Sequence, residues 1–430
     1  SNKIRGEDKG FRGIGRLCGL AYCDTLVFRT SYLDESIGSI MTCDAKKMRE
    51  MLTSNIKYTI DEIWDTIVSY DTFVENPTEH YFEVKLCNIG KAHEKLLDES
   101  EIVGYLNFVA PVPYKNTFIL RDQIYGFAQT HKCRIDEYCI KVNGKQIFKD
   151  YTTRLKEIAG SGVKNYDEIS KLEFHEFFNS NGKRIAWMWI GLSGFEKCIP
   201  KVNVMRGIRL RSANIQIGGN DRLQELFKES RGNYYFVGEV FAEDKGLVPN
   251  SQRDYFNENE SRVEFEDALR LYFYDVLHKL YYDANRIKSD YKKQIDYASK
   301  VEDYNEKAQN NGFVDENARR KLFEAIEKAQ KEAEEAQKRI SKLQQMASNS
   351  PLIEVHKNIK NKYGSAISDN DKSKLEPVQD EKNSGYIAAT FSKLSRSERK
   401  LVSRILTIIA DIAPKDIAEK IINNIKEELK

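Results

Sequence analysis

The chain has 430 residues, of which 40% are hydrophobic and 31% charged, which is enough for two or three domains with their own cores. Its formal net charge of +2 gives no general attraction to nucleic acid or membranes, and no apolar run approaches the roughly 20 residues of a membrane-spanning helix. The 7 cysteines include no C-x-x-C pair, and His131, Cys133 and Cys139 lack a zinc spacing, so we expect a cytoplasmic protein with reduced cysteines and no metal site.

A glycine-rich stretch lies close to the first residue. Gly10, Gly13 and Gly15, which we call the glycine box, have the spacing G-x-x-G-x-G, with Arg12 between them and a helical apolar pattern that starts at Leu17. Glycine lets backbone N–H groups approach an anion, and a helix N-terminus offers further unpaired N–H groups. The spacing therefore predicts a phosphate-binding loop, and an ordinary glycine-rich surface turn fits it equally well.

The glycine box resembles the second glycine box of the ATPase superfamily that includes gyrase, heat-shock protein 90, histidine kinases and MutL (GHKL), in which a lid loop closes over the phosphates of ATP. The β-prone run at residues 24–32 resembles the strand that follows this lid in the heat-shock protein 90 branch. The resemblance implies that residues 1–110 are the C-terminal part of a GHKL ATPase domain with its lid, and that the glycine box and Arg12 contact ATP.

Two other boxes of the superfamily should precede the lid. One supplies the general base and a magnesium ligand, and the other reads adenine. Only 9 residues precede Gly10, so neither box can be present before the lid. The resemblance therefore implies that this chain is a C-terminal fragment, that ATP and Mg²⁺ bind the full-length protein, and that the fragment alone holds neither and is inactive.

The rest of this first part has a mixed α and β pattern. A helix is predicted near residues 44–52 and another over residues 60–68, followed by an alternating strand over residues 81–86. Pro111 and Pro113 then mark a domain junction.

Residues 111–285 are predicted to form a strand-rich domain. An Asn-Gly pair at residues 143–144 predicts a two-residue hairpin turn, because both residue types tolerate positive φ. The runs 172–177 and 185–190 are expected to pair across another turn, with His175 and the tryptophans packed within the sheet.

Four runs in the middle of the chain follow one another in a recognisable order, at residues 203–211, 218–220, 235–240 and 247–256. This series resembles the transducer, or middle, domain of heat-shock-protein-90-like ATPases, which has a left-handed βαβ fold of the ribosomal S5 domain 2 type. In that family a loop reading Leu-Pro-Leu-Asn-x-Ser-Arg-Glu reaches back to the γ-phosphate of ATP. The matching residues are Leu247, Pro249, Asn250 and Arg253, with Asp254 in place of Glu.

This second resemblance implies that Asn250 and Arg253 lie at the nucleotide, with Arg253 as the catalytic group that senses it. A guanidinium stays charged and can hold a phosphate by two parallel hydrogen bonds. The competing interpretation is a structural arginine that pairs with Asp254 or Glu258.

Two further arginines suggest a different class of partner. Arg209 and Arg211 alternate along a predicted strand and would therefore lie on one face. Such a face can contact a nucleic-acid backbone, although it is more often solvated or paired with neighbouring acids.

The C-terminal third is predicted to be helical. Residues 286–363 are expected to form a charged helical hairpin or coiled coil, with a turn at residues 310–312 and a helix cap at Asp315. Residues 364–390 have the composition of a linker, and residues 391–430 are predicted to form C-terminal helices that open with a capping box. The apolar faces of these helices need a partner surface, either on the same chain or on a second copy.

These features predict an α+β chain with a partial GHKL ATPase layer, a ribosomal S5 domain 2-like transducer domain and a helical C-terminal region. The resemblance implies an ATP-driven conformational clamp, similar to heat-shock protein 90 or its MORC-like relatives, which forms a homodimer and can act on a protein client. The alternative is a non-catalytic module on the same fold that binds nucleic acid or protein. Nucleic acid is the less favoured partner, and no membrane contact is expected.

Overall fold

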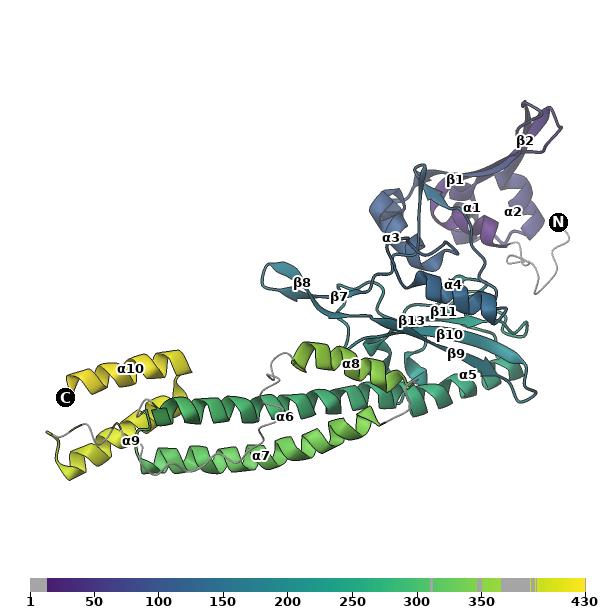
Figure 1. Cartoon of the computed structure of the whole chain (residues 1–430). Helices are drawn as coiled ribbons and strands as arrows, with labels where there is room; N and C mark the ends of the chain where they lie inside the picture. The colour runs from purple at the N-terminus through teal and green to yellow at the C-terminus, as the bar shows by residue number, and fades with distance from the viewer. Residues whose placement is uncertain are drawn as a thin grey trace.

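The chain forms a small antiparallel sheet domain, a larger mixed sheet and a long helical arm that carries the C-terminal helices (Figure 1). It is an α+β protein, as the sequence predicts. The computed structural model describes residues 14–309, 312–345, 350–364, 387, 391 and 393–429.

The N-terminal sheet has four antiparallel strands in the order β3-β2-β1-β4. A 3₁₀ helix, η1, precedes the sheet, and two helices follow β2 along the chain. On β1, Leu26 and Phe28 share one face and pack with Leu20 of η1 and with Ala45. The elements are η1 (Ile14–Ala21), β1 (Cys23–Ser31), β2 (Ile37–Asp44), α1 (Ala45–Thr53), α2 (Ile60–Ile67), β3 (Val68–Val74) and β4 (Tyr81–Ile89).

Helix α3 leads from this sheet toward the second domain. It follows the short helix η2 (Lys91–Leu97) and spans Glu99–Val109. The carboxylate of Asp98 accepts hydrogen bonds from the backbone N–H groups of Ser100 and Glu101, at 2.8 and 3.4 Å, and so caps the helix. Beyond α3 the chain passes through the predicted proline-containing junction.

The second sheet has five strands in the order β12-β11-β13-β10-β9. β11 and β13 run parallel, and the other neighbours are antiparallel. Helix α4 covers one face and helix α5 the other (Figure 1). The elements are α4 (Arg121–Thr130), β9 (Lys171–Phe178), β10 (Arg184–Leu192), β11 (Gly207–Ser212), β12 (Ile215–Ile217), β13 (Val237–Ala242) and α5 (Glu260–Tyr272).

The two predicted hairpins are confirmed. Asn143 and Gly144 have φ values of 49° and 79° and join β5 (Lys141–Val142) to β6 (Lys145–Gln146). Strands β9 and β10 pair across a turn in which Gly182 has a φ of 73°.

Other small elements surround this sheet. A separate two-stranded ribbon, β7 (Arg154–Ala159) with β8 (Gly162–Glu168), projects from the domain (Figure 1). Two short 3₁₀ helices, η3 (Gln224–Leu226) and η4 (Ser230–Tyr235), lie on the connection from β12 to β13.

The helical arm begins under the second sheet. Helix α5 continues through a π-helical turn, η5 (Phe273–Leu277), into α6 (His278–Gln309). The predicted domain boundary at residue 285 therefore falls inside α6. Helix α7 (Glu316–Gln344) packs along α6 and confirms the predicted helical hairpin, and α8 (Pro351–Tyr363) returns toward the sheet (Figure 1).

Specific contacts hold this hairpin together. The guanidinium of Arg339 on α7 grips both carboxylate oxygens of Asp290 on α6, with Nε–Oδ2 at 3.0 Å and Nη2–Oδ1 at 2.6 Å. At the start of α7 the Asp315 carboxylate accepts a hydrogen bond from the backbone N–H of Ala318 at 2.8 Å, so the predicted cap is confirmed.

Two helices, α9 (Arg396–Ile412) and α10 (Lys415–Glu428), end the described chain. The predicted capping box is present, because Ser395 and Glu398 each bond the backbone N–H of the other. Most of the predicted linker at 364–390 lies outside the described residues. Among the residues that are described, no helix is long and apolar enough to cross a membrane.

Candidate functional site

Only part of the glycine box lies within the described residues. Gly10, Arg12 and Gly13 lie outside the described residues. Gly15 belongs to the first turn of η1, and no heavy atom lies within 4 Å of the place where a Cβ would stand. Close packing within the described structure is therefore not what requires glycine at residue 15.

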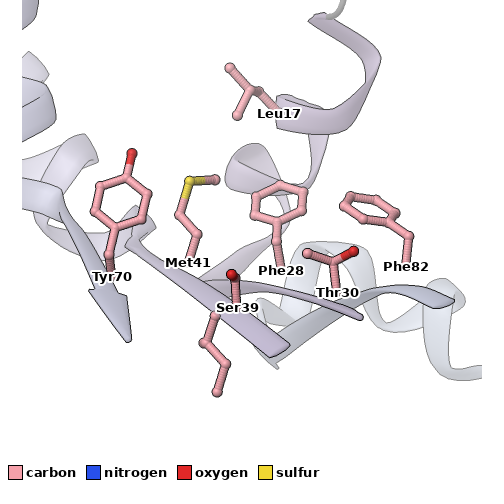
Figure 2. Close-up of a pocket in the computed structure, with 8 residues that line it drawn as sticks. Leu17, Phe28, Thr30, Ser39, Met41, Tyr70 and Phe82 are labelled. Carbon is pink, nitrogen blue, oxygen red and sulfur yellow. The ribbon is translucent and has the colours of Figure 1, made fainter. Parts of the chain in front are cut away.

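An apolar cavity of about 400 Å³ lies beside η1 on the N-terminal sheet. Figure 2 shows Phe28, Met41, Tyr70 and Phe82 standing on one side of the sheet, with Leu17 facing them from η1. Among the described residues that line it, the only polar side chains besides Tyr70 are those of Thr30 and Ser39, and none of these described residues is charged. The described residues that line it are Leu17, Phe28, Thr30, Ser39, Ile40, Met41, Tyr70 and Phe82.

A second cavity, which we call the junction groove, contains the predicted sensor Arg253. It measures about 630 Å³ and lies where α3 meets β11, β12 and the loop at 247–256. Ligand sites are frequent at such junctions between domains. Its lining shares no residue with the first cavity and consists of Gly104, Tyr105, Phe108, Val109, Val204, Arg209, Ile215, Gln216, Gly218, Gly219, Gln252, Arg253 and Asp254.

The loop that carries Arg253 has a sharply defined backbone. Arg253 has a φ of 56°, a left-handed conformation that is uncommon outside glycine. Its N–H donates to the Asn250 carbonyl at 3.2 Å, and its carbonyl accepts from the Gly218 N–H at 3.0 Å. A Cβ on Gly218 would stand 2.5 Å from the Asp254 carbonyl oxygen, so glycine there lets the loop lie against the end of β12.

The predicted nucleotide residue Asn250 braces this loop and is absent from the lining of the groove. Its N–H donates to the Tyr255 carbonyl at 2.9 Å, and its side-chain amide donates to the Asp254 carboxylate. Its amide oxygen is buried without a hydrogen-bond partner. The structure therefore places Arg253 at the groove and Asn250 in the support of its loop.

Arg209 and Arg211 lie on one face of β11, as predicted, but that face is buried. Their side chains belong to residues that are only 6% and 0% exposed. Arg209 lies over the ring of Phe108 at 4.2 Å, and Arg211 donates to the Phe108 carbonyl at 2.8 Å. The interpretation of these two arginines as a nucleic-acid face is wrong, because both are occupied in holding the end of α3.

Arg211 belongs to a buried network around Glu239 on β13. The Glu239 carboxylate pairs with Arg211 and accepts hydrogen bonds from Lys149 Nζ at 3.0 Å, from the Tyr151 hydroxyl at 2.8 Å and from the Tyr114 hydroxyl. Lys149, Arg211 and Glu239 are all 0% exposed. We call these five residues the Glu239 network.

The two cations of this network contribute unequally to stabilising the Glu239 carboxylate. Burial acts to raise the pKa of Glu239, but Arg211 and Lys149 outweigh it and lower that pKa to about 2. Burial, together with the positive charge of Arg211, lowers the pKa of Lys149 to about 7 in spite of the nearby carboxylate. Arg211 is therefore the principal counter-ion of Glu239.

Sequence reasoning missed the Glu239 network. A signal was available, because Glu239 interrupts an apolar strand pattern that runs from Tyr235 to Phe241. A carboxylate in such a run has to be paired when the strand is buried. The partners could not be identified in the same way, since Tyr114 stands 125 residues away in the chain.

The comparisons with known proteins leave the site to be interpreted from its own residues. No protein-family model matches the chain, and no curated protein matches it either. Within the described residues, no group of three or more His, Cys, Asp or Glu is placed to hold a metal ion.

Replacing Arg211 or Lys149 tests whether the two cations contribute unequally to the free energy of unfolding. We expect Arg211→Met to lower the free energy of unfolding by about 3–5 kcal/mol, because it leaves a buried carboxylate without its main counter-ion. Lys149→Met at pH 8 should cost clearly less. Urea unfolding of both variants measures the difference, and equal losses would contradict the assignment of Arg211 as the principal counter-ion.

The pKa of Lys149 also predicts a pH dependence. Between pH 7 and about 10 the unfolded chain holds a proton on this lysine that the folded chain has released, so stability rises with pH. Relative to Lys149→Met, the wild type should gain roughly 2–4 kcal/mol of unfolding free energy over this range. The exposed Lys141→Met is the control, and a flat difference for both variants would contradict the assigned pKa.

Proposed function

We propose that this chain is part of an ATP-driven conformational clamp in which the glycine box closes over ATP and Arg253 senses its phosphates. The observation that carries the proposal is the position of Arg253, whose strained loop puts it in a groove between the last helix of the N-terminal domain and the second sheet. A phosphate at this place would touch both domains. Binding of this phosphate can then shift the equilibrium between two arrangements of the domains.

A continuous set of packed elements leads from the groove to the far end of the molecule. Arg211 ties the end of α3 to Glu239 on β13. On the opposite face of the sheet, Val240 of β13 packs with Phe265 and Leu269 of α5. Because α5 continues into α6, a movement at the groove is transmitted to the helical arm as a rigid-body displacement.

The clamp also needs a second copy, and α9 offers a surface for it. Leu401, Ile405, Ile408 and Ile412 are 60%, 45%, 49% and 79% exposed, and their spacing puts them on one stripe of the helix. The opposite side of α9 packs through Leu406 into the chain's own C-terminal core. We propose that the stripe joins two copies and that the resulting clamp acts on a protein client.

The nucleic-acid-binding alternative has lost its main support. It relied on Arg209 and Arg211, and both are buried under α3. A non-catalytic protein-binding module remains the second candidate, since the exposed stripe on α9 suits a protein partner equally.

Truncating the sensor tests the proposed function. In the full-length protein, Arg253→Ala should lower kcat for ATP roughly 10- to 1000-fold and abolish nucleotide-dependent closure, because the charge on the γ-phosphate loses its guanidinium. Arg253→Lys should recover part of the activity. The matched control is the half-exposed Arg270→Ala on α5. Wild-type kcat and closure in Arg253→Ala would rule out the sensor role.

Polar substitution on the stripe tests the second copy. Ile405→Asp combined with Ile408→Asp should convert a dimer into a monomer, because it places two charges in an apolar interface. Ala410→Asp, at an exposed position on the other side of α9, adds the same kind of charge and should leave the dimer intact. Sedimentation equilibrium measures the mass, and a monomeric wild type would contradict this part of the proposal.

A further inference from the structure

The lining of the junction groove carries more positive than negative charge. Its own lining contains Arg209 and Arg253 against Asp254. Directly behind it, on the same strand as Arg209, stands Arg211, which shares the Glu239 carboxylate with Lys149. Because Glu239 offsets the charge of Arg211, the positive field in the groove comes mainly from Arg209 and Arg253.

Arg209 has no carboxylate among its hydrogen-bond partners within the described residues, although the charge of Glu239 also acts on it. Its guanidinium donates to the Gln216 side-chain oxygen at 2.9 Å and to the Val204 carbonyl, which are both neutral acceptors. Its Nε is buried with no hydrogen-bond partner. Burial lowers the pKa of Arg209, which shows that its charged form is held at a cost in this site.

The floor and walls of the groove are rigidly built. Arg209 lies over the Phe108 ring of α3, and Gly218 lets the loop of Arg253 lie against the end of β12. Both arginines thus face the same space from two different elements. The volume of about 630 Å³ lies within the usual range of small-molecule sites.

We propose that the junction groove binds a phosphate-bearing anion and that Arg209 is its second guanidinium, beside Arg253. This inference rests on the proposed function only in placing Arg253 at the same site. An anion supplies a charged acceptor in place of neutral ones, and two guanidinium groups approaching from different sides suit the several oxygens of a polyphosphate. The phosphate chemistry can come from the tail of a nucleotide or from a free polyphosphate.

Calorimetric titration of the whole chain with inorganic tripolyphosphate tests the site. We expect saturable binding that weakens at least about tenfold in both Arg209→Met and Arg253→Met, which corresponds to the loss of one charge-assisted contact. Methionine keeps much of the packing of Arg209 on Phe108. Arg206→Met is the matched control, since Arg206 packs on Tyr234 outside the groove and should bind as the wild type does.

A second variant keeps the proposal testable if Arg209→Met does not fold. Val204 lines the groove and is 60% exposed, so Val204→Trp should fold normally and fill the space with all charges kept. It should also weaken tripolyphosphate at least tenfold. Absence of saturable binding to the wild type, or wild-type affinity in both Arg209→Met and Val204→Trp, would overturn the proposal.

Competition with ATP identifies the source of the phosphate. Displacement of tripolyphosphate by ATP supports a site for the nucleotide tail, and binding of tripolyphosphate without such displacement supports a site for free polyphosphate. The result for the anion site can be distinguished from the result for the sensor role of Arg253. If Arg253→Ala leaves ATP turnover unchanged while tripolyphosphate binding still depends on Arg209, the sensor role fails and the anion site stands.

Discussion

The ion pair between Arg211 and Glu239 is the interaction on which the rest of the structure depends. Both residues are fully buried, so each charge is tolerated only because the other is present. The pair joins two parallel strands, and through Lys149, Tyr114 and Phe108 it attaches the chain that enters the domain. Such a network tolerates few alternative arrangements, because any shift leaves a buried charge or hydroxyl unsatisfied.

The second sheet owes its two different faces to this network. Toward α5 the sheet presents apolar side chains such as Met188 and Val240, which pack without directional preference. Toward α3 and α4 it presents the charged network among aromatic rings, including Trp189. The apolar face couples the sheet to its helices by close packing, whereas the polar face holds the end of α3 by directional bonds. The groove lies at the edge of the polar face, where a small displacement of α3 changes its shape.

The features that the sequence predicted are those whose chemistry is complete within a few residues. The turn at Asn143 and Gly144, the Asp315 cap and the capping box at Ser395 are examples, because each depends on local backbone geometry. Strands β2 and β3 were missed, since many of their residues are polar or exposed and the alternation is weak. The alternation of Arg209 with Arg211 identified their common face, but only tertiary packing shows that α3 covers it.

The π-helical turn η5 determines how α6 is rotated about the helix axis relative to α5. An α-helix advances by about 100° per residue, so the one additional residue of a π-turn rotates everything downstream by roughly that angle. The core-facing stripe on α5 is thereby brought into phase with the residues of α6 that meet α7 and α8. Deletion of a single residue between Phe273 and Leu277 would keep the helix intact and yet turn the whole arm to a different side of the molecule.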